Sequence, residues 1–282
     1  MMNMNHGNLK IIKLGNALLI CLAAWVLTGC EDVVKVDLDN VEPRLVIEAY
    51  ITDNPPLAVA IITKSADFYD LSTFSLVSGA TVIIYDDLGA ADTIPEYEHG
   101  VYVSQSVFAH VGLTYTAEVT VDSVTYTAQA SLPPPIDIDS LVTQYQPGGG
   151  FGYEADEGYR LHVFFTDHPA IEDFCYLKVQ VNDSLLDDYY LYDGKYSDGH
   201  IIDYERFGDV FELGDTMTVA IYTMDQAVYD YFSTLVNVIA YSGGGEQQYG
   251  GVPANPNTNW DNGALGYFAV FGVRTATLVI TE

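Results

Sequence analysis

Between residues 44 and 132, short stretches of alternating apolar and polar residues follow one another without a helical period. They are rich in Val, Ile, Thr and Tyr, and turn-forming clusters such as Asp86-Asp87-Leu88-Gly89 separate them. The expected strands span residues 45–51, 57–63, 80–85, 101–104, 115–121 and 124–130. Asp122-Ser123 fits a tight hairpin between the last two. The pattern predicts a small N-terminal β-sandwich of the Ig-like or prealbumin-like type.

Three consecutive prolines, Pro133-Pro134-Pro135, interrupt this pattern. Because proline has no N–H to donate to a sheet and favours an extended backbone, residues 133–136 are expected to form a stiff linker. Strand patterns then resume, with loops rich in glycine and acidic residues between them. The expected strands span residues 140–145, 159–166, 174–181, 201–206, 216–224, 265–273 and 274–281. Residues 137–282 are therefore predicted to form a second β-rich domain.

One segment of the second domain has a helical period. Its apolar residues recur at spacings of three and four. They are Val228, Tyr231, Phe232, Leu235, Val238 and Ile239. Asp225 is a suitable N-cap, and Gly243-Gly244-Gly245 is expected to end the helix. We predict one helix over residues 225–241, with its apolar stripe packed on a β-layer, in a chain that is otherwise mainly β.

The N-terminus has the features of an export signal. Two lysines precede an apolar run over residues 14–27, which is too short to span a bilayer. The run ends in Leu27-Thr28-Gly29-Cys30, the pattern of a bacterial lipobox, in which the cysteine sulfur receives a diacylglycerol before cleavage. We predict a lipoprotein signal peptide over residues 1–29, a lipidated Cys30, and a short acidic tether over residues 30–43 that leads to the first domain.

Charge adds to the picture of an exported protein. The sequence has 10 Lys+Arg against 39 Asp+Glu, a formal net charge of −29. Residues 1–29 contain two lysines and no acid, so the mature chain would carry 8 − 39 = −31. This balance argues against nucleic acid and against a polybasic membrane patch, because both need clustered Lys and Arg. Glu31, rather than an Asp, follows the lipid cysteine, which favours the outer membrane; the choice between its periplasmic and cell-surface faces stays open.

Catalytic signatures are missing from the sequence. It contains no HExxH, no G-x-S-x-G, no phosphate-binding loop and no paired CxxC, and its histidines have no second ligand at metal spacing. Cys175, the one cysteine of the mature domains, lies in the apolar Phe174-Cys175-Tyr176-Leu177 and is expected to be a buried thiol. We therefore expect no enzyme and no cofactor, with a hydrolase site assembled only in the fold as an alternative.

The candidate ligand site lies in an acidic, tyrosine-rich stretch from Asp183 to Asp203. Its carboxylates could coordinate calcium, which prefers oxygen ligands, although a solvated acidic loop is the simpler interpretation. The candidate calcium ligands are Asp187, Asp188, Asp193 and Asp198. Aromatic side chains could form a surface for a sugar, a peptide or a protein partner. The candidates for this surface are Tyr189, Tyr190, Tyr192, Tyr196 and Trp260.

Several segments, taken in order, resemble a family of Bacteroidetes outer-membrane lipoproteins known as domain of unknown function 4249. The segments are the lipobox with Cys30 and residues 43–53 (PRLVIEAYITD), 64–70 (KSADFYD), 77–82 (VSGATV), 100–102 (GVY) and 262–268 (NGALGYF). They span nearly the whole chain. Because such families often sit beside TonB-dependent outer-membrane transporters, the resemblance implies a role as a transporter accessory, with such a receptor as its partner.

The expected function follows from these points together. It is a non-enzymatic accessory lipoprotein, anchored to the outer membrane and associated with a TonB-dependent transporter in nutrient capture or uptake. The alternative is a surface glycan- or peptide-binding module that acts independently of a transporter.

Overall fold

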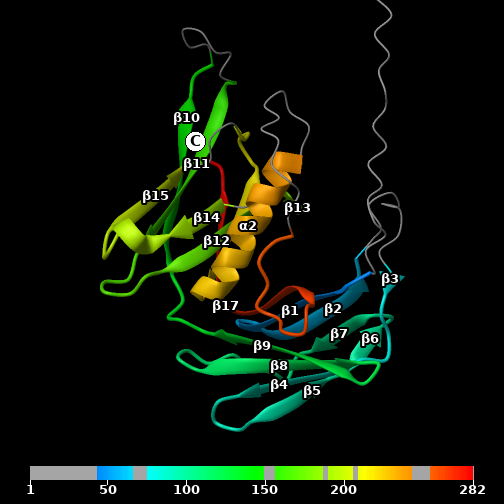
Figure 1. Ribbon diagram of the computed structural model, residues 1–282. Helices are drawn as coiled ribbons and strands as arrows, with labels where there is room; N and C mark the ends of the chain where they lie inside the picture. The colour runs from blue at the N-terminus through cyan, green and yellow to red at the C-terminus, as the bar shows by residue number, and fades with distance from the viewer. Residues whose placement is uncertain are drawn as a thin grey trace, which may run out of the picture. The chain divides into compact units, whose positions relative to one another are not determined.

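A computed structural model describes residues 43–65, 75–148, 156–186, 190–205, 209–242 and 255–281 (Figure 1). The predicted signal peptide, Cys30 and the tether up to residue 42 lie outside these residues. Within the described ranges, no helix is long and apolar enough to cross a membrane.

Most strands join one ten-stranded sheet. Eight of them follow the order β13-β12-β16-β17-β1-β2-β7-β6, while β14 pairs with β12 and β3 pairs with β2. Their bounds are β1 Leu45–Asp53, β2 Pro56–Lys64, β3 Ser75–Leu76, β6 Glu96–Glu98, β7 Val101–Ser104, β12 Phe174–Val181, β13 Ser184–Leu185, β14 Tyr190–Asp193, β16 Thr216–Met224 and β17 Leu265–Val279. β1 and β17 run parallel, whereas β1 and β2 and also β16 and β17 run antiparallel.

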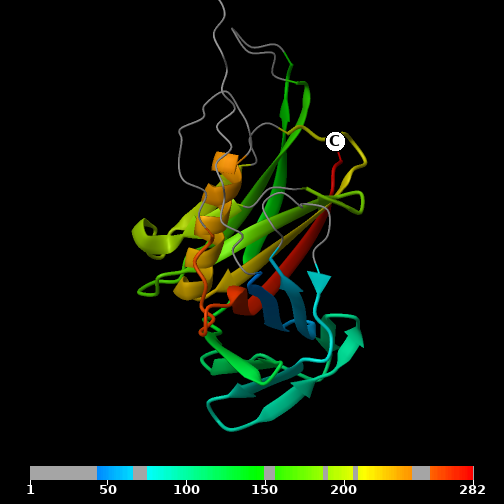
Figure 2. The ribbon, with the colours of Figure 1, turned by 45° about the vertical axis from the view of Figure 1, so that its right-hand side comes forward.

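Two smaller sheets and a helix complete the fold. One sheet has the strand order β5-β4-β8-β9 and the other has the order β10-β11-β15. Their bounds are β4 Thr81–Asp86, β5 Ala91–Ile94, β8 Thr114–Val121, β9 Val124–Ser131, β10 Ile138–Gln146, β11 Gly158–Thr166 and β15 Ile201–Glu205. The helix is α2, Gln226–Ser242, and a single 3-10 turn, η1, spans Gly194–Tyr196. Figures 1 and 2 show the four-stranded sheet lying against the β1–β2 part of the large sheet.

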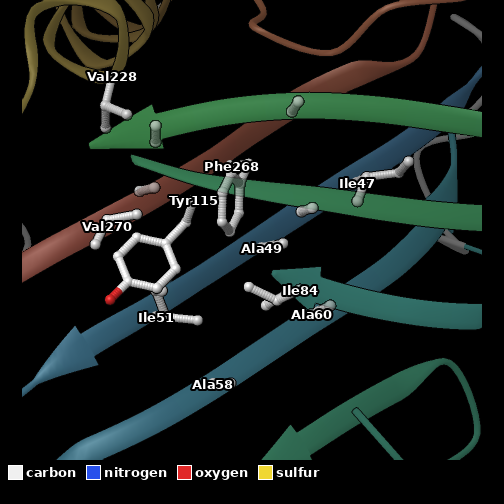
Figure 3. Close-up of a cluster of buried hydrophobic side chains, with 14 of the residues drawn as sticks. Ile47, Ala49, Ile51, Ala58, Ala60, Ile84, Tyr115, Val228, Phe268 and Val270 are labelled. Carbon is white, nitrogen blue, oxygen red and sulfur yellow. The ribbon is translucent and has the colours of Figure 1, made fainter. Parts of the chain in front are cut away.

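One face of the ten-stranded sheet packs against the four-stranded sheet. Ile47, Ala49 and Ile51 alternate along β1 and are fully buried on this face. The register places Phe268 of β17 beside Ala49, and Ile84 of β4 belongs to the same hydrophobic cluster. Figure 3 shows these side chains between the two layers. The arrangement is a β-sandwich, as the sequence predicts for this part of the chain.

The same face is covered farther along the sheet by the three-stranded sheet. The register carries this face from β17 through Ile221 of β16 to Leu177 of β12. Both side chains share a second buried cluster with Leu161 and Val163 of β11. Cys175 also lies in this cluster, and burial raises the pKa of its thiol well above the usual value. The prediction of a buried structural thiol is therefore confirmed.

The expected fold class, mainly β with a sandwich and one packed helix, is confirmed within the described residues. A strand occurs at each position expected from alternation, with ends that differ by one or two residues in places. One expectation is wrong: residues 265–273 and 274–281 form the single long strand β17 rather than two strands. The short strands β3, β5, β6, β13 and β14 were not expected, because they contain too few residues to show an alternating pattern.

The ten-stranded sheet takes strands from both sides of the triple proline, which the sequence analysis assigned to separate domains. β17, near the C-terminus, pairs with β1, near the start of the described chain. The proline segment itself packs against β17, where a Cβ on Gly272 would lie 2.7 Å from Pro135 Cγ. Directly after it, the backbone N–H of Ile136 donates to Thr223 Oγ1 at 2.9 Å. The segment thus follows the sheet surface.

Helix α2 begins as the sequence predicts. Asp225 Oδ1 accepts a hydrogen bond from the backbone N–H of Val228 at 3.1 Å, which is the N-cap geometry. Asp225 Oδ2 accepts a second one from the N–H of Ser131 at 2.7 Å. The cap therefore also fixes the start of the helix to the end of β9. The three glycines expected to end the helix lie outside the described residues.

Two segments of the family resemblance that lie far apart in the chain, residues 43–53 and 262–268, meet in the structure. Arg44 Nε donates to the carbonyl of Gly263 at 2.8 Å. Gly266 has a φ of +90°, and a Cβ at this position would collide with the backbone carbonyl of Ile47. Glycine is therefore required where β17 crosses beside β1. These residues hold the parallel strand pair together.

A second group of these segments is joined by one carboxylate. Glu96 accepts hydrogen bonds from the hydroxyl of Ser78 and from the backbone N–H groups of Gly79 and Gly100. The hydroxyl of Ser78 and these two N–H groups hold the pKa of Glu96 below its usual value. The segments at 77–82 and 100–102 thus form a structural corner.

Candidate functional site

The opposite face of the ten-stranded sheet carries a cluster of aromatic side chains. Alternation along each strand turns every second residue to this face. Four neighbouring strands supply one ring each: Tyr50 on β1, Phe271 on β17, Tyr222 on β16 and Tyr176 on β12. We call these four rings, together with Lys178 of β12, the aromatic pocket.

The rings form a continuous aromatic surface. Tyr176 and Tyr222 are stacked, with ring centroids 4.6 Å apart and planes 18° apart. Phe271 meets both of them edge-on, with centroids at 5.6 Å in each case. Tyr50 lies on its other side at 6.0 Å. Phe271, only 2% exposed, is therefore the floor of the pocket.

Helix α2 borders the aromatic surface. The ring centroid of Phe232 lies 5.1 Å from those of Tyr176 and Tyr267, and 6.4 Å from that of Phe271. Tyr231 packs on Tyr267 at 4.8 Å. The apolar stripe of the helix therefore packs on the sheet of the same chain, as predicted. These contacts also position the side of the pocket that faces the helix.

The β1–β2 hairpin provides the rim of the pocket. Asp53 fixes the hairpin to β17, because its Oδ1 accepts from the backbone N–H of Val273 at 2.8 Å and its Oδ2 accepts from Arg274 Nη1 at 2.9 Å. Thr52 Oγ1 donates to the carbonyl of Pro55, which follows a cis peptide bond from Asn54. The rim is thus tied to the sheet on both sides of the turn.

Lys178 is the one charged residue among those that line the pocket. Its Nζ lies 5.3 Å from the ring centroid of Tyr176 and 5.4 Å from that of Tyr222, within the range of a cation–π interaction. Partial burial lowers its pKa. Among the described residues, no carboxylate lies within ion-pair distance of this ammonium.

The pocket is small and polar at its edges. Its volume is about 190 Å³, below the roughly 300–1,000 Å³ of pockets that enclose a drug-sized ligand. Burial raises the pKa values of Tyr50 and Tyr222, so both hydroxyls stay protonated and can donate hydrogen bonds. The pocket can therefore hold one ring-sized group on an aromatic floor, with donors around it.

The aromatic residues proposed from the sequence do not form a common surface. Trp260 is only 5% exposed and donates from Nε1 to the carbonyl of Ile47 at 3.0 Å. Tyr192 is 6% exposed and donates to Asp167 Oδ1 at 2.9 Å. Both side chains are therefore buried and hydrogen-bonded inside the protein rather than displayed on its surface.

The other members of that predicted surface are dispersed. Tyr190 is half-buried, with its ring centroid 3.9 Å from that of Tyr204. Tyr196, 87% exposed, stands on the surface beside Lys195. Tyr189 lies outside the described residues. Among the described members of the set, Tyr196 is the one that presents a large exposed aromatic area.

The two predicted calcium ligands that the structure describes accept hydrogen bonds from backbone N–H groups. Asp193 Oδ1 accepts from the backbone N–H of Lys195 at 2.9 Å, and Asp198 Oδ1 accepts from that of Ala170 at 2.5 Å. Asp187 and Asp188 lie outside the described residues. Across the described ranges, no three acidic, histidine or cysteine side chains are arranged to hold a metal ion. Calcium binding at this loop stays a prediction.

The acidic stretch has a buried anchor that its sequence pattern does not indicate. Asp167 and Asp173, both almost fully buried, hold the loop around η1. Asp167 Oδ2 accepts from the N–H of Gly199 at 3.1 Å, and Asp173 Oδ2 accepts from that of His168 at 2.7 Å. Burial raises the pKa of Asp173. These contacts are structural, since they satisfy backbone groups of the same loop.

The aromatic pocket itself was also missed. Its rings come from four strands that lie far apart in the chain, and each ring is a single tyrosine or phenylalanine within a strand pattern. One signal was present: Tyr176 and Lys178 alternate with the apolar Cys175, Leu177 and Val179 on β12. Such alternation marks a second face, but it does not show which other strands share that face.

The fold defines a mainly β protein with a β-sandwich, and its large sheet carries the aromatic pocket on one face. The chain belongs to the family described as "Domain of unknown function (DUF4249)", whose model matches residues 31–277. No curated protein matches the chain. A solved structure with some similarity is that of the chicken CNTN1 FN1–FN3 domains, with 10% identity, 65% of this chain and 60% of that chain covered, and a TM-score of 0.25. A similarity this weak supports no argument about function.

Proposed function

We propose that the protein is a non-enzymatic binding lipoprotein, anchored to the outer membrane through a lipid on Cys30, and that it serves as the accessory of a TonB-dependent transporter. The lipobox, the net charge of −29 and the family membership support this proposal. So does the resemblance to Bacteroidetes lipoproteins, because such families often lie beside these transporters. A chain tethered in this way would collect or hand over a nutrient at the membrane.

The observation that carries the binding role is the aromatic pocket. Folding alone does not explain why a lysine and two half-buried tyrosines, Tyr50 and Tyr222, line a common hollow. Ligand pockets combine apolar walls with a few polar groups in this manner. Among the described residues that line the pocket there is no Ser, His, Cys, Asp or Glu, the residues that most often act as nucleophile or general base.

The anchor is tested by fractionating membranes of a native host that expresses the full-length tagged chain. We expect the protein in the outer-membrane fraction and a diacylglycerol-modified N-terminal cysteine by mass spectrometry. Cys30→Ser should release it from the outer membrane. A Cys30→Ser protein that fractionates like the wild type would overturn the lipid anchor.

The partner is tested by purifying the lipidated protein from the same membranes in mild detergent. We expect a transporter barrel to co-purify, and to be lost from a Tyr50→Ala/Tyr222→Ala variant if the pocket contributes to contact. Tyr97→Ala is the matched control, because Tyr97 is 77% exposed and lies outside the pocket. Recovery of the wild-type protein without any barrel would contradict the transporter association.

The second candidate function is a surface glycan- or peptide-binding module that acts without a transporter. The same pocket favours it, since an aromatic floor suits the apolar face of a sugar ring or a peptide side chain. Recovery of the wild-type protein alone, together with ligand binding that the Tyr50→Ala/Tyr222→Ala variant loses, would support this function over the first.

A further inference from the structure

Lys178 distinguishes the aromatic pocket from an ordinary apolar hollow. It is a cation held in a partly buried position, over the faces of Tyr176 and Tyr222. Elsewhere in the described chain, Arg160 and Arg274 face carboxylates at 2.6 Å and 2.9 Å. In a protein with 39 acidic residues and 10 basic ones, acidic partners are plentiful, yet none in the described ranges neutralises Lys178.

An unneutralised charge in a partly buried position costs free energy, which an anion of a ligand would recover. The cation–π contacts fix the ammonium at the pocket wall, because both rings lie within 5.5 Å of it. Among the described residues that line the pocket, Lys178 is the only charged one, so an incoming anion meets no carboxylate among them. The position is therefore suited to a single negative group.

The other residues that line the pocket indicate the shape and polarity of the rest of the ligand. Phe271 supplies a flat floor, and Tyr50 and Tyr222 supply hydroxyl donors on either side of it. These two hydroxyls have no protein hydrogen-bond partner in the described part of the chain, so they are available to a ligand. A volume of about 190 Å³ limits the enclosed part to one ring with small substituents.

We propose that the aromatic pocket binds a ring that carries a carboxylate, with the ring on the aromatic floor and the carboxylate facing the ammonium of Lys178. This inference rests on the proposed function of the pocket as a binding site and names the class of its ligand. A sugar acid and an aromatic acid share this chemistry. The tyrosine hydroxyls would bind the hydroxyl groups of the first, and the aromatic floor alone would hold the second.

The test is isothermal titration calorimetry on the full-length lipoprotein in detergent, with four probes. Sodium D-glucuronate is compared with methyl glucoside, and sodium benzoate with benzyl alcohol. We expect at least one carboxylate to bind about tenfold or more tighter than its neutral counterpart, as a charge-assisted hydrogen bond would provide. Preference for glucuronate assigns a sugar acid, and preference for benzoate assigns an aromatic acid.

Three variants show whether Lys178 is responsible. Lys178→Met keeps the length of the side chain but removes the charge, so it should reduce the carboxylate to the affinity of the neutral probe. Lys178→Arg should keep most of the preference. Lys64→Met is the matched control, because Lys64 is exposed on β2 and lies outside the pocket. A single cooperative thermal unfolding transition in each variant would show that it folds.

Two results would overturn the inference while leaving the proposed function in place. One is equal binding of the neutral and charged probes, or a preference that Lys178→Met does not change. The other is binding of neither carboxylate by a protein that still co-purifies with a transporter through the aromatic pocket. Failure of the proposed function is seen separately, as recovery of the protein without a membrane partner and without any pocket-dependent ligand.

Discussion

The two faces of the ten-stranded sheet carry different kinds of side chain: one is aliphatic and the other is aromatic with polar groups. The face toward the smaller sheets is lined by aliphatic residues such as Ile47, Ile51 and Ile221, which are fully buried. The other face carries Tyr50, Tyr222 and other aromatic residues with polar ends, and α2 borders only part of it (Figure 1). The first face is buried core, whereas the second combines buried rings with the partly buried side chains of Lys178, Tyr50 and Tyr222.

The largest loss of stability is expected from a substitution at Gly266, where β17 approaches β1 closely. Gly266→Ala places a Cβ against the carbonyl of Ile47 at a φ of +90°. Backbone strain and overpacking add, so we expect a loss of about 3 kcal/mol or more in the free energy of unfolding. Urea unfolding checks this value. Gly89→Ala is the control: it has a similar φ of +94° but open space around it, and should cost about 1 kcal/mol. Equal losses would refute the role assigned to the close approach.

Neighbouring residues on β1 provide the next comparison, since they point to opposite faces. Ile51→Ala removes a fully buried side chain and should cost about 3 kcal/mol. Tyr50→Ala removes a half-buried one and should cost about 1 kcal/mol, while abolishing ligand binding. Chemical denaturation and calorimetry on the two variants measure both quantities. A larger stability loss for Tyr50→Ala than for Ile51→Ala would contradict the division between the faces.

Lys178 should lower stability at neutral pH. Its folded-state pKa lies below the unfolded value of about 10.4, so the charged form is disfavoured in the fold. The wild type is therefore least stabilised below the folded pKa and gains stability as the pH rises from there to about 10.4. Lys178→Met should be about 0.5–1 kcal/mol more stable than the wild type at pH 7, and the gap should close near pH 10.5. Urea unfolding of both proteins at pH 7 and pH 10.5 measures this difference in stability. A difference that grows as the pH rises would contradict the assignment to the charge of Lys178.

The smallest expected effect is spectroscopic. Trp260 packs on Phe268, on the side of the sheet away from the pocket, and is buried. A ligand in the aromatic pocket should therefore leave the tryptophan emission unchanged while the tyrosine absorbance shifts. Difference spectra with and without ligand measure both signals. A change in Trp260 emission without a change in tyrosine absorbance would place the ligand on the wrong face.

Local patterns predicted the strands and the helix well, because alternation and capping act over a few residues. The cap at Asp225 and the hairpin at Asp122-Ser123, where both residues have positive φ, are examples. The pairing of β17 with β1 could not be predicted, because no local pattern encodes a partner more than 200 residues away. The aromatic pocket could not be predicted for the same reason: the density of tyrosine in the sequence favours residues 189–196, whereas the pocket gathers rings from four strands that lie far apart in the sequence.

Photocrosslinking in native membranes tests most directly whether the aromatic face is the functional one. A p-benzoylphenylalanine replaces Tyr50 in one strain and Tyr97, exposed outside the pocket, in another. After irradiation, we predict that the Tyr50 position yields a discrete crosslinked product with a membrane protein or a bound ligand, and that the Tyr97 position yields none. Products from Tyr97 alone, or none from Tyr50 in a protein that is folded and anchored, would contradict the account.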